Sequence, residues 1–213
     1  MLCISSLACG CSTILPSPPS ASSTAVSSSS LTDTNESGLT VEEQKKVDAG
    51  EYVAASVKHR AFNVPKPVFP EAAREETLEG AEAFIRYWVD LRNYASSTGD
   101  VDDISRITAP DSDREQEFYK NISNIYENNQ WLSQYEMKVD FEDNDFVLGE
   151  DGFYRFLVRP SVSASKYCDI SGECKDEKGD IFQGKPGVIA LYYDQSQWTF
   201  VALLGVEGIN YEE

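Results

Sequence analysis

The chain has 213 residues, with 18 lysines and arginines against 36 aspartates and glutamates, so its formal net charge at pH 7 is −18. A chain this acidic, with no basic cluster, is a poor match to nucleic-acid phosphates and to anionic membrane surfaces. His59 is the single histidine, which excludes most catalytic triads and histidine-rich metal sites. No apolar run of about 18 residues or more is present, so no ordinary transmembrane helix is predicted.

Residues 1–11, MLCISSLACGC, resemble the end of a bacterial lipoprotein signal, in which small residues precede a cysteine that becomes acylated. Cys11, or alternatively Cys9, is the expected lipid-bearing residue. A secretory signal also needs a basic n-region, and the first basic residue here is Lys45. We therefore expect that Met1 is an internal start and that the true start lies upstream. The alternative is a cytosolic protein with a disordered serine-rich tail.

Residues 12–60 are predicted to be a flexible tether. Serine, proline, alanine and threonine dominate its first part, which includes the uninterrupted run Ser27–Ser30. Such a composition cannot bury enough apolar surface to offset the entropy lost on ordering. The end of this segment, from Leu39, is polar and weakly helical in pattern. Residues 61–213 are then expected to form the acidic folded domain.

The folded part is predicted to begin with a long amphipathic helix. Apolar residues recur at alternating steps of three and four, at Ala81, Phe84, Trp88, Leu91 and Ala95. Gly99 is positioned to end this helix, because glycine readily adopts the left-handed conformation that follows a helix. Pro70, before an Ala-rich stretch, suits an earlier helix start.

Two shorter helices are expected next. The first covers Asp100–Ile107, with Asp100 or Asp102 as its N-cap. The second opens with the sequence Ser112-Asp-Arg-Glu115, which has the pattern of a capping box. Three of its residues are expected to face inward, namely Phe118, Ile122 and Ile125.

After Trp131 the apolar period changes from that of a helix to that of a strand, with Met137, Val139 and Phe141 alternating with charged residues. Asp151-Gly152 predicts a hairpin turn before one strand over residues 153–168. Two more strands are expected near residues 187–193 and 197–206. The predicted fold class is α+β, with about three N-terminal helices on one face of an antiparallel sheet of about four strands.

Cys168 and Cys174 flank a turn-forming Ser-Gly pair in the sequence YCDISGEC, so they could close a hairpin as a disulfide. The alternative is two free thiols in a reducing cytosol. Zinc is a poor alternative, because a structural site needs four cysteine or histidine ligands.

The segment TLEGAEAFIRYW at residues 77–88, continued by NYASSTGD at 93–100 and preceded by VPKP and Pro70, resembles an uncharacterised family of actinobacterial lipoproteins, domain of unknown function family 6318. The resemblance extends from about Pro65 to Val206 and implies an NTF2-like cone with a curved sheet. Relatives often carry a cysteine pair after the second helix, where this chain has Asp111 to Arg114. Membership brings no known activity.

A cone of this kind often encloses a pocket, and Tyr87, Asp90 and Tyr94 share one face of the long helix. A buried aspartate beside a tyrosine could transfer protons, because burial raises the pKa of a carboxyl group. The alternative, which we favour, is that the tyrosines pack at the rim and that Asp90 is solvated.

Oxygen-bearing side chains from Asp140 to Asp151 follow part of a calcium-loop pattern, but Asp145 stands where the loop needs glycine. A charged strand face followed by a turn explains this stretch better. Asn35 and Asn121 begin glycosylation sequons by pattern only. No phosphate loop, dinucleotide fingerprint or catalytic elbow is present, so no catalytic, cofactor or metal residue is predicted.

These observations predict a non-enzymatic, lipid-anchored protein on the extracytoplasmic face of the cell membrane, acting as a binding or interaction module. Its expected partners are the membrane, through the lipid, and an unknown envelope protein or small molecule, with no nucleic acid. One alternative is a small-molecule carrier or enzyme that uses the cone cavity, with Asp90 and Tyr94 as candidates. Another is an intracellular interaction protein.

Overall fold

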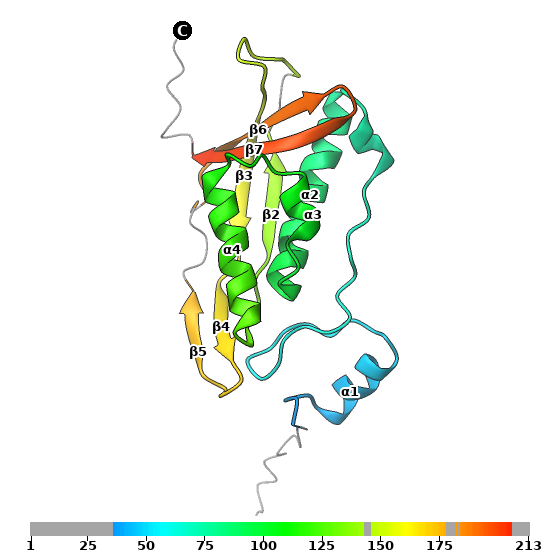
Figure 1. The fold of residues 1–213 in the computed structure, drawn as a ribbon, viewed down its shortest axis with the longest axis vertical. Coiled ribbons are helices and arrows are strands. Elements are labelled where there is room, and N and C mark those ends of the chain that lie inside the picture. The colour runs from blue at the N-terminus through cyan, green and yellow to red at the C-terminus, as the bar shows by residue number, and fades with distance from the viewer. Residues whose placement is uncertain (1–35, 143–145, 178–181, 183, 206–213) are drawn as a thin grey trace, which may run out of the picture. The chain divides into compact units, whose positions relative to one another are not determined.

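The computed structural model describes residues 36–142, 146–177, 182 and 184–205 (Figure 1). The chain divides into Met1–Thr32 and Asp33–Glu213, and every described residue belongs to the second unit. The lipid candidates Cys9 and Cys11 therefore lie outside the described residues, as do Asn35 and most of the serine-rich tether. Among the described helices, none combines the length and the apolar character that a membrane span requires.

Residues 36–62, here called the N-terminal arm, are part of the fold. Helix α1 (Val41–Asp48) begins with a capping box, in which the Thr40 hydroxyl accepts from the Glu43 amide at 3.2 Å and the Glu43 carboxylate accepts from the Thr40 amide at 2.8 Å. Val53 then pairs with Phe62 in an antiparallel bridge, and Leu39 is buried. Residues 36–60 of the proposed tether therefore include a helix and a bridge, and the boundary at residue 61 stays a prediction.

The long helix is confirmed as α2 (Leu78–Thr98), which follows the short 3₁₀ helix η1 (Glu71–Arg74). The Thr77 hydroxyl accepts from the Gly80 amide at 3.0 Å and caps its first turn. Gly99 ends the helix with a φ of 82°, and a Cβ atom there would lie 2.5 Å from the Cβ of Tyr126. Glycine is therefore required at this position by both its backbone conformation and its neighbour.

Helices α3 (Asp102–Arg106) and α4 (Asp113–Glu127) lie where two shorter helices were predicted, but their caps differ. Val101 occupies the N-cap of α3, while the Asp100 carboxylate accepts from the Asp102 amide at 3.1 Å. Ser112 makes no side-chain cap bond to α4. The predicted capping box is wrong because the Glu115 side chain is buried and pairs with an arginine of α2.

Seven strands in the described residues form two antiparallel sheets in place of the single sheet predicted. The larger sheet has the order β2 (Met137–Phe141), β3 (Tyr154–Val162), β6 (Gly187–Asp194) and β7 (Gln197–Gly205). The smaller has the order β1 (Gln130–Ser133), β4 (Ser165–Asp169) and β5 (Cys174–Glu177). The positions predicted for β2, β6 and β7 are confirmed, and the Asp151-Gly152 turn lies between β2 and β3.

The strand predicted over residues 153–168 is divided into β3 and β4, which belong to different sheets. Opposite this break, β1 and β2 are also separate, and Gln134 between them has a φ of 65°. Ser163 joins the two breaks, since its amide donates to the Glu136 carbonyl at 2.9 Å and its hydroxyl accepts from the Glu136 amide at 2.8 Å. The segment that contains β1 and β2 and the segment that contains β3 and β4 therefore bend at the same place, and each continues from one sheet into the other.

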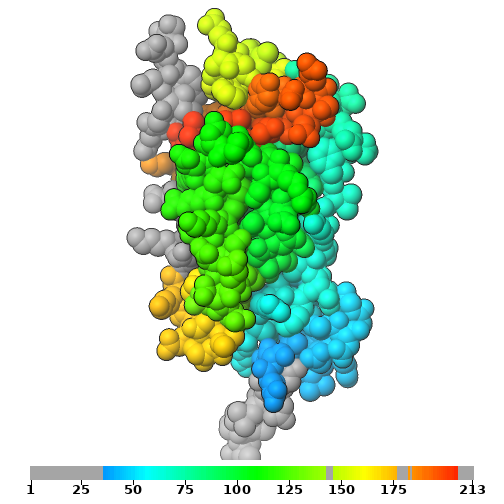
Figure 2. Space-filling model, in the orientation of Figure 1, coloured from blue at the N-terminus to red at the C-terminus, as the bar shows by residue number. Residues whose placement is uncertain are grey.

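The main core lies between α2 and the larger sheet. In Figure 2 the green surface of α3 and α4 occupies the centre of the face shown. The fully buried rings of Trp88 on α2 and Phe200 on β7 stack with centroids 3.9 Å apart and an interplanar angle of 1°. The segment between α3 and α4 joins the edge of β7, because the Ala109 amide donates to the Phe200 carbonyl at 2.7 Å. The architecture is mixed α and β, and the NTF2-like cone stays a prediction.

Candidate functional site

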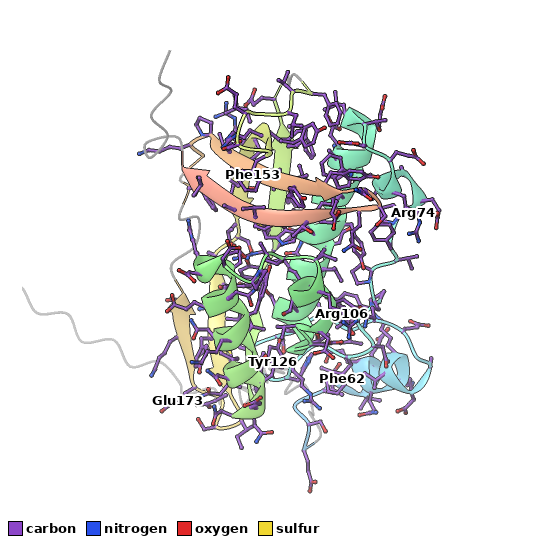
Figure 3. The ribbon with its side chains drawn as sticks, turned by 45° about the horizontal axis from the view of Figure 1, so that its top comes forward. Phe62, Arg74, Arg106, Tyr126, Phe153 and Glu173 are labelled. Atoms are coloured by element: carbon purple, nitrogen blue, oxygen red, sulfur yellow. A yellow bond between two sulfur atoms is a disulfide. The ribbon has the colours of Figure 1, made fainter. Side chains whose placement is uncertain are left out.

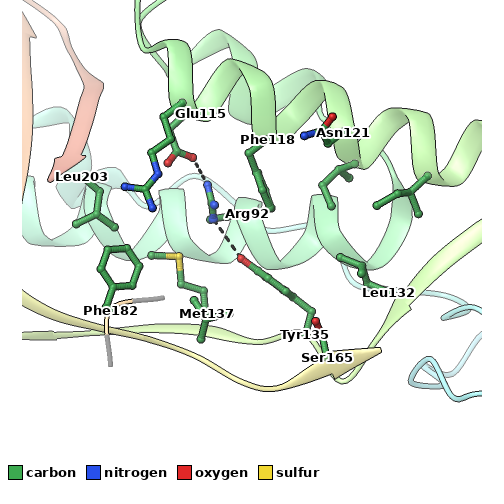
Figure 4. A pocket seen from close by; sticks show the side chains of 14 residues that line it. Arg92, Glu115, Phe118, Asn121, Leu132, Tyr135, Met137, Ser165, Phe182 and Leu203 are labelled. Carbon is green, nitrogen blue, oxygen red and sulfur yellow. Dashed lines mark hydrogen bonds and ion pairs between the residues drawn. The ribbon is translucent and has the colours of Figure 1, made fainter. Parts of the chain in front are cut away.

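A cavity of about 250 Å³ lies between α4, α2 and residues of both sheets (Figure 4). Its apolar lining consists of Phe118, Ile122, Ile125, Leu132, Met137, Val162, Phe182 and Leu203. Its polar lining consists of Arg92, Arg114, Glu115, Asn121, Tyr135 and Ser165. A largely apolar concave site with a few polar groups is the usual composition of a small-molecule site.

Helix α4 supplies one wall of the cavity because its inward residues recur every three or four positions. The inward direction predicted for Phe118, Ile122 and Ile125 is confirmed, since all three line the cavity. Ile122 is buried, whereas the other two are half-buried. Glu115 lies on the same cavity-facing side of α4, because it precedes Phe118 by three residues, about one helical turn.

Three polar side chains form a connected network in this cavity (Figure 4). Arg92 donates from Nη1 to the Glu115 carboxylate, and its Nε donates to the Tyr135 hydroxyl at 3.2 Å. The guanidinium also lies over the Phe118 ring, 3.6 Å from its centroid. The Arg92 and Glu115 side chains are only 12 % and 5 % exposed, so solvent screens this pair little.

The network keeps Arg92 charged although burial opposes that charge. Burial works to lower the pKa of the guanidinium, but Tyr135 and Glu115 together raise it above its ordinary value. A buried ion pair is tolerated only when further hydrogen bonds satisfy its atoms, and Tyr135 supplies one of them. The polar group at the centre of the cavity is therefore a fixed guanidinium.

A second set of hydrogen bonds holds the helices that carry this network. Trp88 Nε1 donates to the Tyr119 hydroxyl at 3.2 Å, and that hydroxyl lies 2.9 Å from Thr108 Oγ1. Burial raises the pKa of Tyr119 far above its ordinary value, and the nearby Glu115 charge acts in the same direction. Tyr119 is therefore a neutral structural group that ties α4 to α2 and to the end of α3.

The residues predicted as a possible pocket, Tyr87, Asp90 and Tyr94, do not line this cavity. Asp90 and Tyr94 are each two positions from Arg92, which places them on nearly the opposite face of α2. There they line an open groove with Lys66, whose Nζ lies 5.9 Å from the Tyr94 ring centroid.

The environments of Asp90 and Tyr87 differ from those that proton transfer in a closed cavity would need. Asp90 is an exposed residue. Neighbouring atoms still shield part of its carboxyl group from water, which raises the pKa, and the charge of Arg86 opposes this rise. The Tyr87 ring packs edge-on against Phe69, with centroids 5.2 Å apart. Burial raises the pKa of Tyr87, so this phenol stays neutral at physiological pH. The structure thus brings Asp90 and Tyr94 together in a groove, whereas the Tyr87 ring packs against Phe69.

The predicted disulfide between Cys168 and Cys174 is present, and it joins directly opposed residues of β4 and β5. The hairpin that it closes contacts the N-terminal arm, because Cys174 Sγ lies 3.7 Å from the Val57 carbonyl. Figure 3 labels Glu173 in the hairpin turn and Phe62 on the arm, at the same end of the molecule.

Two further candidates from the sequence, His59 and Asp151, contact other groups, whereas Asp143, Asn144 and Asp145 lie outside the described residues. His59 is buried in the arm, with Nδ1 2.9 Å from the Arg60 carbonyl and Nε2 3.6 Å from the Glu43 carboxylate. In the calcium-like stretch, Asp151 pairs with Arg155. Within the part of the chain that the structure describes, no cluster of three or more potential metal ligands exists.

A family model described as a family of unknown function, DUF6318, matches residues 50–203. The chain belongs to this family. The DUF6318 region contains every residue that lines the cavity and both disulfide cysteines. No curated protein and no solved structure shows significant similarity to the chain.

Sequence reasoning missed Arg92, Glu115 and Tyr135, which form the polar network of the cavity. A signal for two of them exists in the sequence. Arg92 stands four residues after Trp88 and so extends the apolar stripe of α2, while Glu115 precedes Phe118 on the inward face of α4. Opposite charges on the inward faces of two adjacent helices indicate a buried ion pair.

Proposed function

We propose that this DUF6318 protein is a binding module that holds a small molecule in the cavity behind α4. The observation that carries the proposal is a cavity whose wall is mostly apolar and in which three polar groups, Arg92, Glu115 and Tyr135, already hold one another in a network. A site that is ordered before the ligand arrives loses little entropy on binding. The cavity is therefore suited to recognition.

The lining groups favour binding over catalysis. Glu115 is the only carboxylate among the lining residues that the structure describes, and it is paired with Arg92. The Tyr135 hydroxyl accepts a hydrogen bond from the same guanidinium. General acid–base catalysis needs a group with a tuned pKa that is free to exchange a proton with the substrate. We therefore propose a non-enzymatic role.

We further propose that the protein is exported and anchored to the extracytoplasmic face of the cell membrane through a lipid on Cys11 or Cys9. Two observations support this location. The Cys168–Cys174 disulfide is of a kind that persists in oxidising compartments. The first residues also have the composition of a lipoprotein signal followed by a flexible tether.

The packing of the long helix α2 against an antiparallel sheet supports an NTF2-like arrangement.

Blocking the cavity tests the binding role. Asn121 is an exposed lining residue of α4, and Lys120 is an exposed neighbour that does not line the cavity. We expect Asn121→Trp to abolish binding of small aromatic probes in ligand-detected NMR, and Lys120→Trp to leave it unchanged. Native mass spectrometry of the wild-type protein should show a bound molecule that Asn121→Trp loses. Equal binding by both variants would reject the cavity as the site.

Inhibition of lipoprotein processing tests the location independently. With a globomycin-type inhibitor of the lipoprotein signal peptidase, we expect the unprocessed chain to accumulate. Cys11→Ser should have the same effect if Cys11 carries the lipid, whereas Cys9→Ser should then be processed normally. An unchanged mass in the presence of the inhibitor would reject the anchor and leave the binding role untouched.

A further inference from the structure

We propose that the ligand of the cavity is a small organic acid, with one carboxylate on an apolar body of about one ring. This inference rests on the proposed function, since it specifies what the same cavity binds. It follows from the charge of the lining, from the unused donors of Arg92 and from the size of the cavity.

The lining is positively charged in a chain whose net charge is −18. Arg92, Arg114 and Glu115 are the charged lining residues that the structure describes, which leaves one positive charge in excess. The other charged residues of α4 do not line the cavity; they are Asp113, Glu117, Lys120 and Glu127. Three of the four acidic residues of the helix therefore lie away from the cavity, and its one arginine lines the cavity beside Glu115.

Arg92 retains donors that no residue of the described chain uses. Its Nε and Nη1 bind Tyr135 and Glu115, whereas Nη2 has no hydrogen-bond partner among the described residues. Nη2 is not sealed in the core either, because Ser96 Oγ is the one described side-chain nitrogen or oxygen that is fully buried without a partner. Nη2 therefore keeps some accessible surface, and Arg92 is one of the residues that line the cavity.

Arg114 provides a second guanidinium on the same lining. Its side chain is exposed, lies 5.7 Å from the Phe182 ring centroid and makes no ion pair with a described residue. A carboxylate can accept hydrogen bonds from two guanidinium groups through its two oxygens. Arg92 and Glu115 balance each other, so the excess positive charge is that of Arg114, and Arg92 contributes hydrogen-bond donors.

The volume and the remaining lining determine the rest of the ligand. A cavity of about 150 Å³ accommodates benzene, and sites for drug-sized ligands begin at about 300 Å³. At about 250 Å³ this cavity suits a single ring or a short branched chain with one polar group. Ile122, Leu132, Met137 and Leu203 offer an apolar surface to that body.

Three probes of nearly the same shape test this inference on the 213-residue chain: benzoate, benzamide and benzylamine. Hydrogen bonds to charged groups correspond to roughly 10- to 100-fold in affinity, so we expect benzoate to bind about tenfold tighter than benzamide, or more. Benzylamine should bind weakest. In Arg114→Gln, benzoate should lose most of this advantage while benzamide affinity stays unchanged. Arg106→Gln, an exposed arginine on α3 that does not line the cavity, is the matched control.

The outcomes separate the two proposals. If benzamide or benzylamine binds as tightly as benzoate and Asn121→Trp still blocks binding, the cavity is a site but its preference for anions is refuted. A benzoate preference that survives in Arg114→Gln refutes the role assigned to Arg114. If none of the three probes binds, the proposed function is rejected, and the anion preference falls with it.

Discussion

Removing one partner of the buried Arg92–Glu115 pair should destabilise the protein more than removing both. In Glu115→Leu, the guanidinium stays in a position where it is only 12 % exposed, without its carboxylate. Breaking a buried pair in this way typically costs about 3–5 kcal/mol of unfolding free energy. Arg92→Met should cost about 1 kcal/mol more, since it also removes the contact with the Phe118 ring and the bond to Tyr135.

The double variant Arg92→Met/Glu115→Leu replaces both charged side chains with apolar ones. Substituting a whole buried pair is often neutral or stabilising, so we expect an unfolding free energy within about 1–2 kcal/mol of wild type. The two changes should then be strongly non-additive, with a coupling of about 3 kcal/mol or more. Urea unfolding followed by tryptophan fluorescence measures this directly, because Arg92 lies 5.4 Å from the Trp88 ring.

A small effect would refute this reasoning. If Glu115→Leu costs less than about 1 kcal/mol and the two changes add, the pair behaves as a solvated surface pair. That result would mean that water in the cavity screens the two charges. The control is the slope of unfolding free energy against urea concentration. It should be the same in the wild type, the two single variants and the double variant, which shows that the same unfolding reaction is measured in each.

Three further predictions concern other parts of the molecule. Replacing Cys168 and Cys174 with serine should lower stability by about 2 kcal/mol, the chain-entropy estimate for so short a loop, in a thermal melt compared with the intact protein. Gly99→Ala should cost at least about 1 kcal/mol, because φ is 82° and the new methyl group meets an aromatic side chain of α4. Arg155 holds the pKa of Asp151 at about 2, below its ordinary value. The Asp151–Arg155 pair therefore contributes to stability above about pH 4, and this contribution is lost as the pH falls toward 2. Asp151→Asn should make the unfolding free energy less dependent on pH in that range.

Local patterns in the sequence predicted the helices well and their caps less well. The period of the apolar residues in α2 and the glycine at its end are sufficient to define that helix. The capping box expected at Ser112 failed, because a cap bond of about 1 kcal/mol cannot hold Glu115 against a buried arginine. That partner lies on another helix, so no local pattern contains it.

The division into two sheets and the cavity were beyond prediction from the sequence for a related reason. The break between β3 and β4 depends on Ser163 and on the loop opposite it, which approach each other only when the strands pair. The apolar stripe of α2 places Arg92 on the inward face of the helix, yet the sequence alone could not show that a cavity remains beside this side chain. Periodicity identifies the faces of a helix, and only the packing of its neighbours shows where a cavity remains.

The stack of Trp88 on Phe200 has a consequence for folding kinetics. These rings join α2 to the last strand, and the lining of the cavity extends from Arg92 to Leu203, so both depend on contacts distant in sequence. The β4–β5 and β6–β7 hairpins need no such contacts and should form earlier. If the contacts around the cavity form after the transition state, a bound molecule should leave the folding rate almost unchanged and slow unfolding. Occupancy would then lengthen the lifetime of the folded protein.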